Sequence, residues 1–396
     1  MRLVGIFLLY ALNATDTDQE VCLWRESHVN DLIGVMSDDQ VTPAIVLVTG
    51  GGGFIGSHLV DALLSEGLSV RVLDNFETGS LQFLDVSNPN LHLFIGSIDD
   101  IDFVTEAMEG VEGVFHLAAA SKVAPSLTDP SMATFNVRTN ALGTANLLEA
   151  AAKSGTVKRF IYAASSTYYG NQNVPFSEFD RFMPSSPYAA TKYMGELLTA
   201  TYDKVFNLPC VNLRFFMVYG PRQPSSGAYA IVTGKFAAQE SLGLPLTIEG
   251  SGDQYRDFIH VKDIVEGILR AYHSDVRGVT INLGTGEKHS IKQVADLISD
   301  NQVHVPPRPH DLHGTLANTT LAEDLLGFIP SRNFSVEIKS LLQSDPRTQL
   351  DPFWNLGQVL DRLDEVIPGF PTRSMQEQDT LIRAFGIEQL LQALFK

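Results

Sequence analysis

The sequence has few cysteines, few basic residues and no internal repeat. Only Cys22 and Cys210 occur among 396 residues, so neither a disulfide framework nor a zinc site built from cysteines can form. Lysine and arginine number 28 against 46 acidic residues, which gives a formal net charge of -18 and no basic stripe. This balance argues against a nucleic-acid-binding protein. An anionic substrate must therefore be held by a few local cations or by backbone N–H groups.

The start of the chain permits two interpretations. Met1-Arg2 is followed by a short apolar run at 3–12 and then by polar residues. A basic start followed by such a run resembles a secretory signal peptide, although the run is too short to span a bilayer. The alternative is a disordered or docked extension, 1–44, that precedes the folded part. We expect a cytoplasmic protein, with the lumen of the secretory pathway as the alternative if 1–14 is a signal peptide.

Strands and helices alternate from Ala44 onward. The first strand, Ile45–Val48, is a continuous apolar run, which is typical of a strand buried on both faces. The apolar pattern predicts further strands at 69–73, 91–95, 114–117, 160–163 and 211–213, and helices at 54–64, 132–152 and 188–206. This alternation predicts an α/β fold, namely a Rossmann-type doubly wound parallel sheet.

The rhythm of the sequence changes after Gly220, where proline and glycine become frequent and strands become shorter. We expect residues 45–220 to form the sheet domain and 221–345 to form mainly a smaller α/β lobe for the substrate. Part of 258–275 is expected to pack back onto the sheet domain. Residues 346–396 carry helical patterns without visible chemistry, so a helical extension is expected there.

A glycine-rich turn separates the first strand from the first helix. Gly50, Gly53 and Gly56 let the backbone approach a pyrophosphate, whose charge the helix N-terminus attracts. Asp74 ends the second strand, where a carboxylate accepts hydrogen bonds from an adenosine ribose and repels a 2′-phosphate. Asn75 supplies no cation to offset that repulsion, so the pattern favours NAD over NADP. The glycines alone could form a structural loop, and Asp74-Asn75 alone could form a turn. The glycines and the aspartate together, in one strand–turn–helix unit, favour a dinucleotide site.

Tyr188 and Lys192 are spaced to lie on one face of a helix. An ammonium group beside a phenol lowers the pKa of the phenol, which makes the tyrosine usable as a general base near neutral pH. Ser165 follows the fifth strand, at the sheet edge where ligands bind, and its hydroxyl can relay a proton. Alone, such a pair is more often a surface lysine stacked along a tyrosine, and such a serine a capping residue. Their place after a dinucleotide site favours catalysis.

The order and spacing of these motifs resemble the extended short-chain dehydrogenases/reductases, the NAD-dependent epimerase/dehydratase family that acts on nucleotide sugars. The resemblance covers about 45–340 and is strongest toward UDP-hexose and UDP-N-acetylglucosamine 4-epimerases. The matching stretches are 49–57 with 74–75, 115–119, 140–150, Tyr188 with Lys192, 213–222, 256–263 and 282–286.

The resemblance implies roles residue by residue. Tyr188, Lys192 and Ser165 match the catalytic residues, with Tyr188 as the base. The NAD-binding residues would be Gly50, Gly53, Phe54, Ile55, Gly56, Asp74, Asn75, Ser97, Ile98, Leu117, Ala118, Ala119, Asn140, Tyr188, Lys192 and Phe215. The substrate-binding residues would be Ser165, Ser166, Thr167, Arg256, Arg308 and Thr315. The two arginines suit a diphosphate, because a guanidinium binds such oxygens in pairs. No metal site is expected.

The residues that follow the catalytic hydroxyl distinguish the branches of this family. Dehydratases carry Asp-Glu there and UDP-glucuronate decarboxylases a Glu, whereas this chain has Ser166-Thr167. The lack of a carboxylate favours 4-epimerisation of a UDP-sugar through a transient 4-keto sugar. The alternatives are a UDP-glucuronate epimerase or decarboxylase, a sugar-nucleotide dehydratase, and a non-catalytic NAD-binding regulator.

Three positions depart from the family pattern. Met217 stands where many members have Asn, Ser97 where an Asp is common, and His310 where a Gly is usual. The methionine removes one polar substrate contact, and NAD binding is expected to survive all three changes. Thr315 stands where a bulky tyrosine limits some epimerases to unsubstituted hexoses, so it indicates room for an N-acetyl group. The resemblance also implies a homodimer through the two long helices next to Asn140 and Tyr188.

Overall fold

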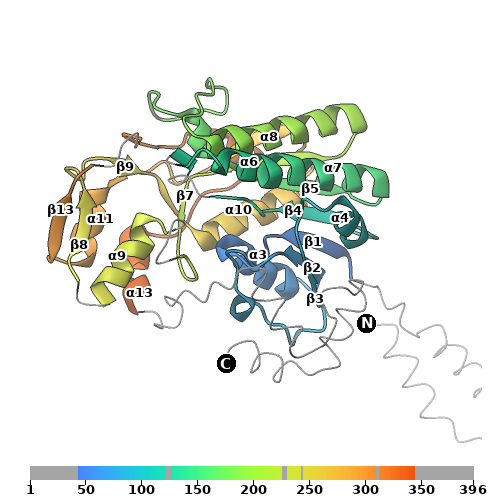
Figure 1. Ribbon diagram of the computed structural model, residues 1–396, viewed down its shortest axis with the longest axis horizontal. Coiled ribbons are helices and arrows are strands. Elements are labelled where there is room, and N and C mark those ends of the chain that lie inside the picture. Colours follow the sequence, from blue (N-terminus) through green and yellow to red (C-terminus); the bar gives the residue numbers. More distant parts are fainter. Residues whose placement is uncertain are drawn as a thin grey trace, which may run out of the picture. The chain divides into compact units, whose positions relative to one another are not determined.

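The computed structural model describes residues 43–121, 126–127, 129–224, 230–241, 244–307 and 312–343 (Figure 1). From Ala44 on they belong to one compact unit. The N-terminal extension 1–42 and the helical extension expected at 346–396 lie outside the described residues. Within the described ranges, no helix combines the length and apolar character that crossing a membrane requires.

Seven parallel strands form the central sheet, in the order β11-β6-β5-β4-β1-β2-β3. The order reverses at β1, because β2 and β3 extend to one side and β4, β5 and β6 to the other. This confirms the predicted Rossmann-type fold, which places ligands at the carboxyl ends of the strands near the reversal. The strands are β1 (Ile45–Thr49), β2 (Ser69–Asp74), β3 (Leu91–Ile95), β4 (Gly113–His116), β5 (Arg159–Ser165), β6 (Cys210–Phe215) and β11 (Val279–Leu283).

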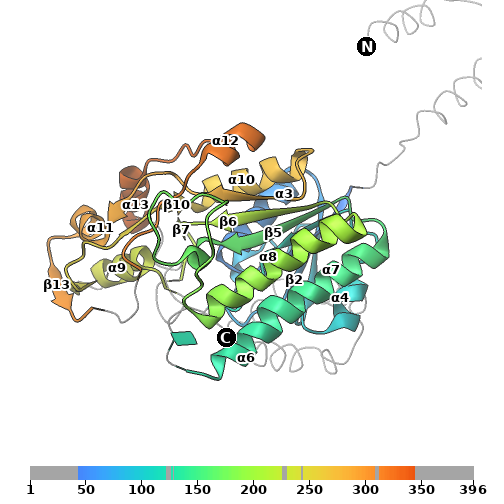
Figure 2. The ribbon, with the colours of Figure 1, turned by 90° about the horizontal axis from the view of Figure 1, so that it is seen from above.

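Helices cover both faces of the sheet (Figures 1 and 2). Val46 and Val48 of β1 belong to the core on one face, and Leu47 belongs to the core on the other. A strand buried on both faces must be apolar throughout, which explains the continuous run in the sequence. The first face carries α3 (Phe54–Ser65) and α10 (Val261–His273), and the second carries α4 (Ile101–Ala107), α7 (Gly143–Ser154) and α8 (Pro187–Phe206).

A π-helical segment interrupts the helix predicted at 132–152. The structure has α6 (Met132–Asn136), then the π segment Val137–Leu142, then α7. The helix predicted at 132–152 is therefore confirmed, and it contains a π turn that the sequence did not reveal, because apolar periodicity does not detect one extra residue in a turn. Such segments occur mostly as single turns, often at functional sites. Here the π segment contains Asn140, whose contacts are described with the site.

The edge strand β11 comes from a part of the chain in which no strand of the large sheet was predicted. It pairs in parallel with β6, from Val279 opposite Val211 to Leu283 opposite Phe215. The chain thus returns to the large sheet, since α10 also contacts α3 and α12 (Thr320–Leu326) contacts β11. Residues 221–345 are therefore shared between the large sheet and a smaller lobe. A five-residue strand in which Thr280 and Asn282 alternate with apolar residues does not reveal by periodicity which sheet it joins.

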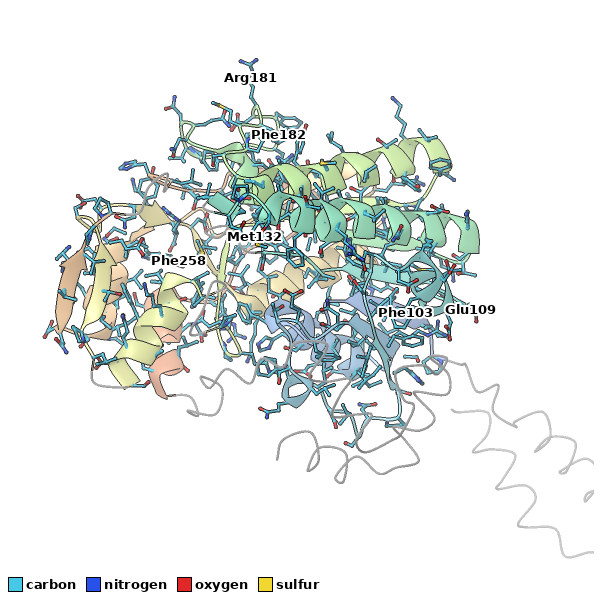
Figure 3. All side chains as sticks on the ribbon, in the orientation of Figure 1. Phe103, Glu109, Met132, Arg181, Phe182 and Phe258 are labelled. Atoms are coloured by element: carbon cyan, nitrogen blue, oxygen red, sulfur yellow. The ribbon has the colours of Figure 1, made fainter. Side chains whose placement is uncertain are left out.

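The smaller lobe consists of short paired strands and three helices. Its core contains Tyr219, Phe236, Ile248 and Phe258, the last labelled in Figure 3. The strand pairs are β7 (Met217–Tyr219) with β10 (Phe258–His260), β8 (Leu246–Glu249) with β13 (Gln302–Val305), and β9 (Tyr255–Arg256) with β12 (His289–Ser290). The helices are α9 (Val232–Ser241), α11 (Ile291–Ile298) and α13 (Phe334–Gln343).

Candidate active site

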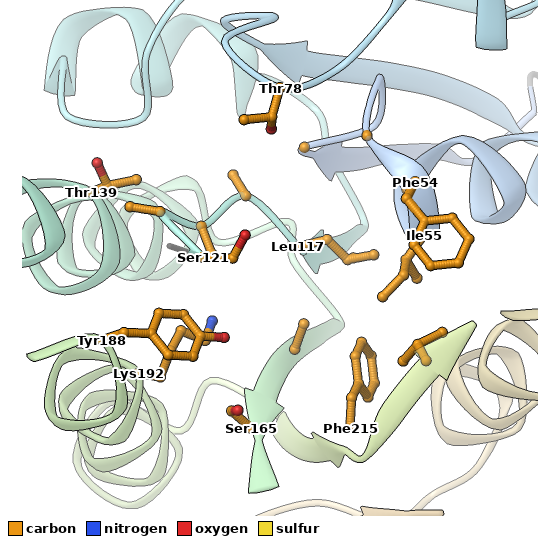
Figure 4. Close-up of a pocket in the computed structure, with 18 of the residues that line it drawn as sticks. Phe54, Ile55, Thr78, Leu117, Ser121, Thr139, Ser165, Tyr188, Lys192 and Phe215 are labelled. Carbon is orange, nitrogen blue, oxygen red and sulfur yellow. The ribbon is translucent and has the colours of Figure 1, made fainter. Parts of the chain in front are cut away.

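A cavity of about 440 Å³ opens at the carboxyl ends of the central strands (Figure 4). This volume lies within the range of small-molecule sites. Its lining includes most of the residues that the sequence singled out: Gly50, Gly53, Phe54, Ile55, Gly56, Asp74, Asn75, Ser97, Ile98, Leu117, Ala118, Ala119, Ser165, Ser166, Thr167, Tyr188, Lys192, Phe215, Arg256 and Thr315.

The glycine-rich turn allows close backbone contacts that a side chain would prevent. Gly50 has φ of +70°, and a Cβ there would lie 2.7 Å from the amide nitrogen of Ala118. A Cβ on Gly56 would lie 2.1 Å from the carbonyl oxygen of Gly50. Helix α3 begins after Gly53 with neither a side-chain cap nor an acidic residue in its first turn. Its first N–H groups are therefore available at the cavity wall, together with the positive end of the helix dipole, and suit the pyrophosphate of NAD.

Asp74 lines the cavity and is held in place by backbone N–H groups. One carboxylate oxygen accepts a hydrogen bond from the Gly52 amide and the other accepts one from the Phe76 amide, both at 2.8 Å. Burial raises the pKa of Asp74 to about 6, although these hydrogen bonds act in the opposite direction. Each oxygen retains a lone pair, so the carboxylate can also accept from ribose hydroxyls.

We predict that the affinity for NAD decreases below about pH 6. Protonation of Asp74, whose pKa is raised to about 6, removes acceptor capacity that the ribose hydroxyls use. The affinity should be constant above that pH and fall by up to about tenfold per pH unit below it. Calorimetric titration with NAD between pH 5 and 8 measures this dependence. The Asp74→Asn variant should bind more weakly and lose the dependence on pH; a variant that keeps it would assign the titration to another group.

Ser165 and Tyr188 form a hydroxyl pair on one wall of the cavity (Figure 4). The Ser165 hydroxyl is placed to hydrogen-bond the Tyr188 hydroxyl and thereby to favour its phenolate. Ser165 Oγ also accepts from the Thr167 amide at 3.2 Å and lies 2.9 Å from Thr167 Oγ1. Ser186 caps α8 by accepting from the Ala189 amide, and a proline opens the helix. This N-terminal geometry fixes the place of Tyr188 in the first turn.

Burial raises the pKa of Tyr188, while the hydrogen bond with Ser165 acts to lower it. This corrects the expectation of a lowered pKa from the spacing of Tyr188 and Lys192. The phenol and the ammonium share a water-poor site, in which desolvation opposes both the phenolate and the ammonium. Ser165 is therefore the neighbour that favours the phenolate form of Tyr188.

Asn140 supports the cavity without lining it. Its side chain accepts from the Ala120 amide at 2.8 Å and donates to the Ala120 carbonyl at 3.2 Å and to Thr191 Oγ1 at 3.0 Å. The Thr191 hydroxyl in turn donates to the Tyr188 carbonyl. Asn140 therefore joins the loop after β4 to the first turns of α8. Asn140 could therefore influence the binding of NAD only indirectly, through the position of this loop.

Arg256 and Thr315, which the sequence assigns to the substrate, also line the cavity and are 8 % and 6 % exposed. The guanidinium of Arg256 donates to the Tyr255 carbonyl, and the Thr315 amide donates to the same carbonyl oxygen. Arg308 and His310 lie outside the described residues. Among the described residues, no group of three or more His, Cys, Asp or Glu side chains could hold a metal ion.

Several lining residues were not singled out from the sequence. Phe135 in α6 and Thr139 in the π segment are four residues apart in the helix predicted at 132–152, so the spacing argument used for Tyr188 and Lys192 could have found them. The others were given no role from the sequence and supply walls of the cavity: Leu73, Glu77, Thr78, Gly96, Ala120, Ser121, Ala163, Ala164, Phe216, Val218, Pro224, Ile231 and Leu312. Met217, noted above as a departure, also lines it.

The sequence matches the model of one protein family and many known relatives. The family model is described as GDP-mannose 4,6 dehydratase and matches residues 47–340. A UDP-glucose 4-epimerase of Mycolicibacterium smegmatis is 34 % identical over 72 % of this chain and 93 % of that protein. A UDP-N-acetyl-alpha-D-glucosaminuronate decarboxylase of Bacillus cytotoxicus is 33 % identical over 75 % of this chain and 96 % of that protein.

The fold also matches solved structures. A UDP-N-acetylglucosamine 4-epimerase from Methanobrevibacter ruminantium, in complex with UDP-N-acetylmuramic acid, has a TM-score of 0.71 and 32 % identity. That match covers 76 % of this chain and 98 % of the other. A UDP-glucose 4-epimerase from Thermotoga maritima, with UDP-glucose, has a TM-score of 0.71 and 32 % identity over 76 % of this chain and 97 % of the other.

Proposed function

The chain belongs to the NAD-dependent epimerase/dehydratase family, whose members act on nucleotide sugars, and we propose that it inverts C4 of a UDP-linked sugar. One observation carries the proposal. The hydroxyls of Ser165 and Tyr188 line the same cavity as the glycine-rich turn and Asp74. Ser166 and Thr167, which follow Ser165, carry no carboxylate. A site of this composition can move a proton on and off a sugar hydroxyl but has no second acid or base there for eliminating water.

Tyr188 acts as the base in this proposal. Its phenolate takes the proton of the C4 hydroxyl, and Ser165 donates a hydrogen bond to the reacting oxygen and relays the proton. NAD, held by the glycine-rich turn and Asp74, would supply the hydride chemistry at C4. The Tyr188 hydroxyl then gives the proton back after the sugar has turned its other face. Lys192 favours the phenolate through the field of its ammonium group.

Arg256 and Arg308 hold the diphosphate in this proposal, so the sugar alone turns while the nucleotide stays fixed. A guanidinium binds phosphate oxygens in pairs and keeps its charge when buried, which suits an otherwise acidic chain. Thr315 and the apolar side chain of Met217 line the same region, and neither adds a charge that would hold the sugar in one orientation.

The experiment that tests the function is product analysis with purified protein, NAD and a panel of UDP-sugars. Mass spectrometry and NMR should show a product of equal mass inverted at C4. A product that has lost carbon dioxide would show that the protein is a decarboxylase, like the Bacillus cytotoxicus relative, and not an epimerase. Loss of water would indicate a dehydratase. Binding of NAD without turnover of any sugar would support a regulator instead.

We predict that the protein turns over UDP-N-acetylglucosamine, because Thr315 is small and lines the cavity. In the Thr315→Tyr variant, kcat/KM for the N-acetyl sugar should fall at least about tenfold, while that for UDP-glucose changes little. Initial rates with both sugars measure the ratio. A strict preference of the parent protein for UDP-glucose would contradict the assignment of Thr315.

We propose further that two copies associate through the outer surface of the π segment and α8. Val137, Leu142, Met194 and Leu197 are 44 %, 47 %, 44 % and 50 % exposed there, and α7 packs beside α8 (Figure 2). Such apolar exposure favours an interface. Light scattering should give a dimer for the parent and a monomer for Leu197→Glu. The control is Ile329→Glu, at an exposed residue elsewhere, and a monomeric parent would refute the proposal.

The cytoplasm is the proposed location. The candidate signal peptide at 1–14, on which the secretory alternative depends, lies outside the described residues. Cell fractionation combined with sequencing of the mature N-terminus distinguishes the two, because a secreted chain would begin after the run.

A further inference from the structure

Lys192 carries its amino group in a buried position that demands an electrostatic partner. The side chain is 3 % exposed. Burial lowers the pKa of Lys192 to about 7, and Glu196 acts in the opposite direction. The ammonium form is the one that helps Tyr188. The protein must therefore supply electron density close to the nitrogen, because a buried charge without a partner is strongly unfavourable.

Glu196, four residues along α8, is already committed elsewhere. Arg214 binds its two carboxylate oxygens at 2.6 and 3.0 Å, and the Tyr168 hydroxyl donates to one of them. Both members of the pair are buried, with Arg214 2 % and Glu196 7 % exposed. Their charges largely cancel, so Glu196 influences Lys192 from a distance. No described carboxylate forms an ion pair with Lys192 itself.

The ring of Tyr162 lies where a partner is needed. Lys192 Nζ is 4.2 Å from the centroid of this ring, well inside the distance of about 6 Å for a cation–π contact. The Tyr162 side chain is fully buried, and its hydroxyl donates to the Lys192 carbonyl at 3.0 Å. Gly195 makes room for that hydroxyl, because a Cβ there would lie 2.2 Å from the oxygen. The ring is thus held against α8 beneath the ammonium.

The other titratable groups around Lys192 are Tyr188 and Glu196 on α8, Tyr162 on β5 and His116 on β4. His116 stays neutral, since burial first and Lys192 second lower the pKa of His116 well below its ordinary value. Its ring nitrogens lie 2.8 Å from hydroxyl oxygens of Thr49 and Thr144. A neutral His116 adds no repulsion, so the face of Tyr162 is a contact at the nitrogen that favours its charge, in addition to the more distant Glu196.

We propose that Tyr162 is a positioning residue, whose ring face keeps Lys192 charged and aimed at Tyr188. The catalytic consequence rests on the proposed function, because it requires Tyr188 to be the base. The electrostatic consequence does not. With less electron density in the ring, Lys192 loses its proton at a lower pH. Activity that needs the ammonium is then lost at a lower pH as well, so the basic limb of the pH–rate profile moves to more acidic values.

The test compares two replacements of nearly equal shape, Tyr162→Phe and Tyr162→3,4,5-trifluorophenylalanine. Both lack the hydroxyl and both keep a buried ring, whereas the fluorines withdraw electron density from the ring face on which the cation depends. NMR of protein labelled with [ε-¹³C]lysine gives the pKa of Lys192 directly, and the Lys192→Arg variant assigns its signal. We expect the fluorinated ring to lower that pKa by about one unit relative to phenylalanine.

The basic limb of kcat/KM should move by the same amount between these two variants. Tyr193→Phe is the matched control, because Tyr193 neighbours Lys192 in sequence but packs against Phe182 with a ring separation of 4.2 Å. It should leave the Lys192 pKa where it is in the parent. Equal pKa values of Lys192 in the phenylalanine and trifluorophenylalanine proteins would overturn the proposal. If no UDP-sugar is turned over, the proposed function fails and the NMR comparison still decides the role of Tyr162.

Discussion

Tyr188→Phe is expected to lower kcat by about 10³-fold while the affinity for NAD stays nearly unchanged, because general base catalysis contributes roughly 10²–10⁴. The phenyl ring keeps the shape of the buried side chain, so the wall of the cavity is preserved. What is lost is the hydroxyl oxygen, the proposed base, whose phenolate form Ser165 favours. Stopped-flow or discontinuous assays of epimerisation, together with calorimetric titration of NAD, measure the two quantities.

Two further variants separate a catalytic effect from a structural one. Tyr202→Phe removes a hydroxyl from the same helix at a residue packed against Phe206, and it should leave kcat unchanged. Ser165→Ala should lower kcat by about 10- to 100-fold, because it removes one hydrogen bond to the reacting oxygen and leaves the base in place. Unchanged turnover in Tyr188→Phe would exclude this tyrosine as the base.

Arg214→Leu is expected to lower the free energy of unfolding by about 3–5 kcal/mol, because it leaves the carboxylate of Glu196 buried without its cation. Arg214 also donates to the Tyr169 hydroxyl and the Glu178 carbonyl, and its guanidinium lies over the rings of Tyr168 and Phe182. Such a loss is a large part of the 5–15 kcal/mol that stabilises a typical domain. Urea-induced unfolding followed by circular dichroism measures it.

The matched comparison is an exposed pair. Lys153→Leu removes a partner of Glu149 on the surface of α7 and should leave the unfolding midpoint nearly unchanged. The double variant Arg214→Leu with Glu196→Leu should recover much of the stability lost by Arg214→Leu, since no lone buried charge remains. A small effect of Arg214→Leu would show that water reaches Glu196 and that the pair is not a structural centre.

The sheet and the cofactor turn could be predicted because their signals are local. The run Ile45–Val48 had to be buried on both faces, and Gly50 and Gly56 mark contacts that exclude a side chain. Tyr188 and Lys192 were found by the same logic, since a spacing of four on a helix specifies one face. Each of these inferences needs only a few consecutive residues.

What could not be predicted depends on contacts between distant segments. The strand at 279–283 shows no sign of its partner at 211–215, which lies far away in the sequence. The pKa of Tyr188 is raised by burial, and burial is set by all the elements that close over the helix. Asn140 carries the family pattern, yet its contacts with Ala120 and Thr191 are visible only in three dimensions.

The late pairing of β11 has a consequence for synthesis on the ribosome. β6 ends at Phe215 and its neighbour begins at Val279, so the edge of β6 remains open until the intervening chain has been translated. At roughly 5–20 residues per second, the nascent chain spends several seconds with the backbone N–H and C=O groups along this edge of β6 unpaired. An unpaired edge is a template for association with other chains. Nascent chains of this protein should therefore engage chaperones most strongly after β6 emerges and be released once β11 has docked.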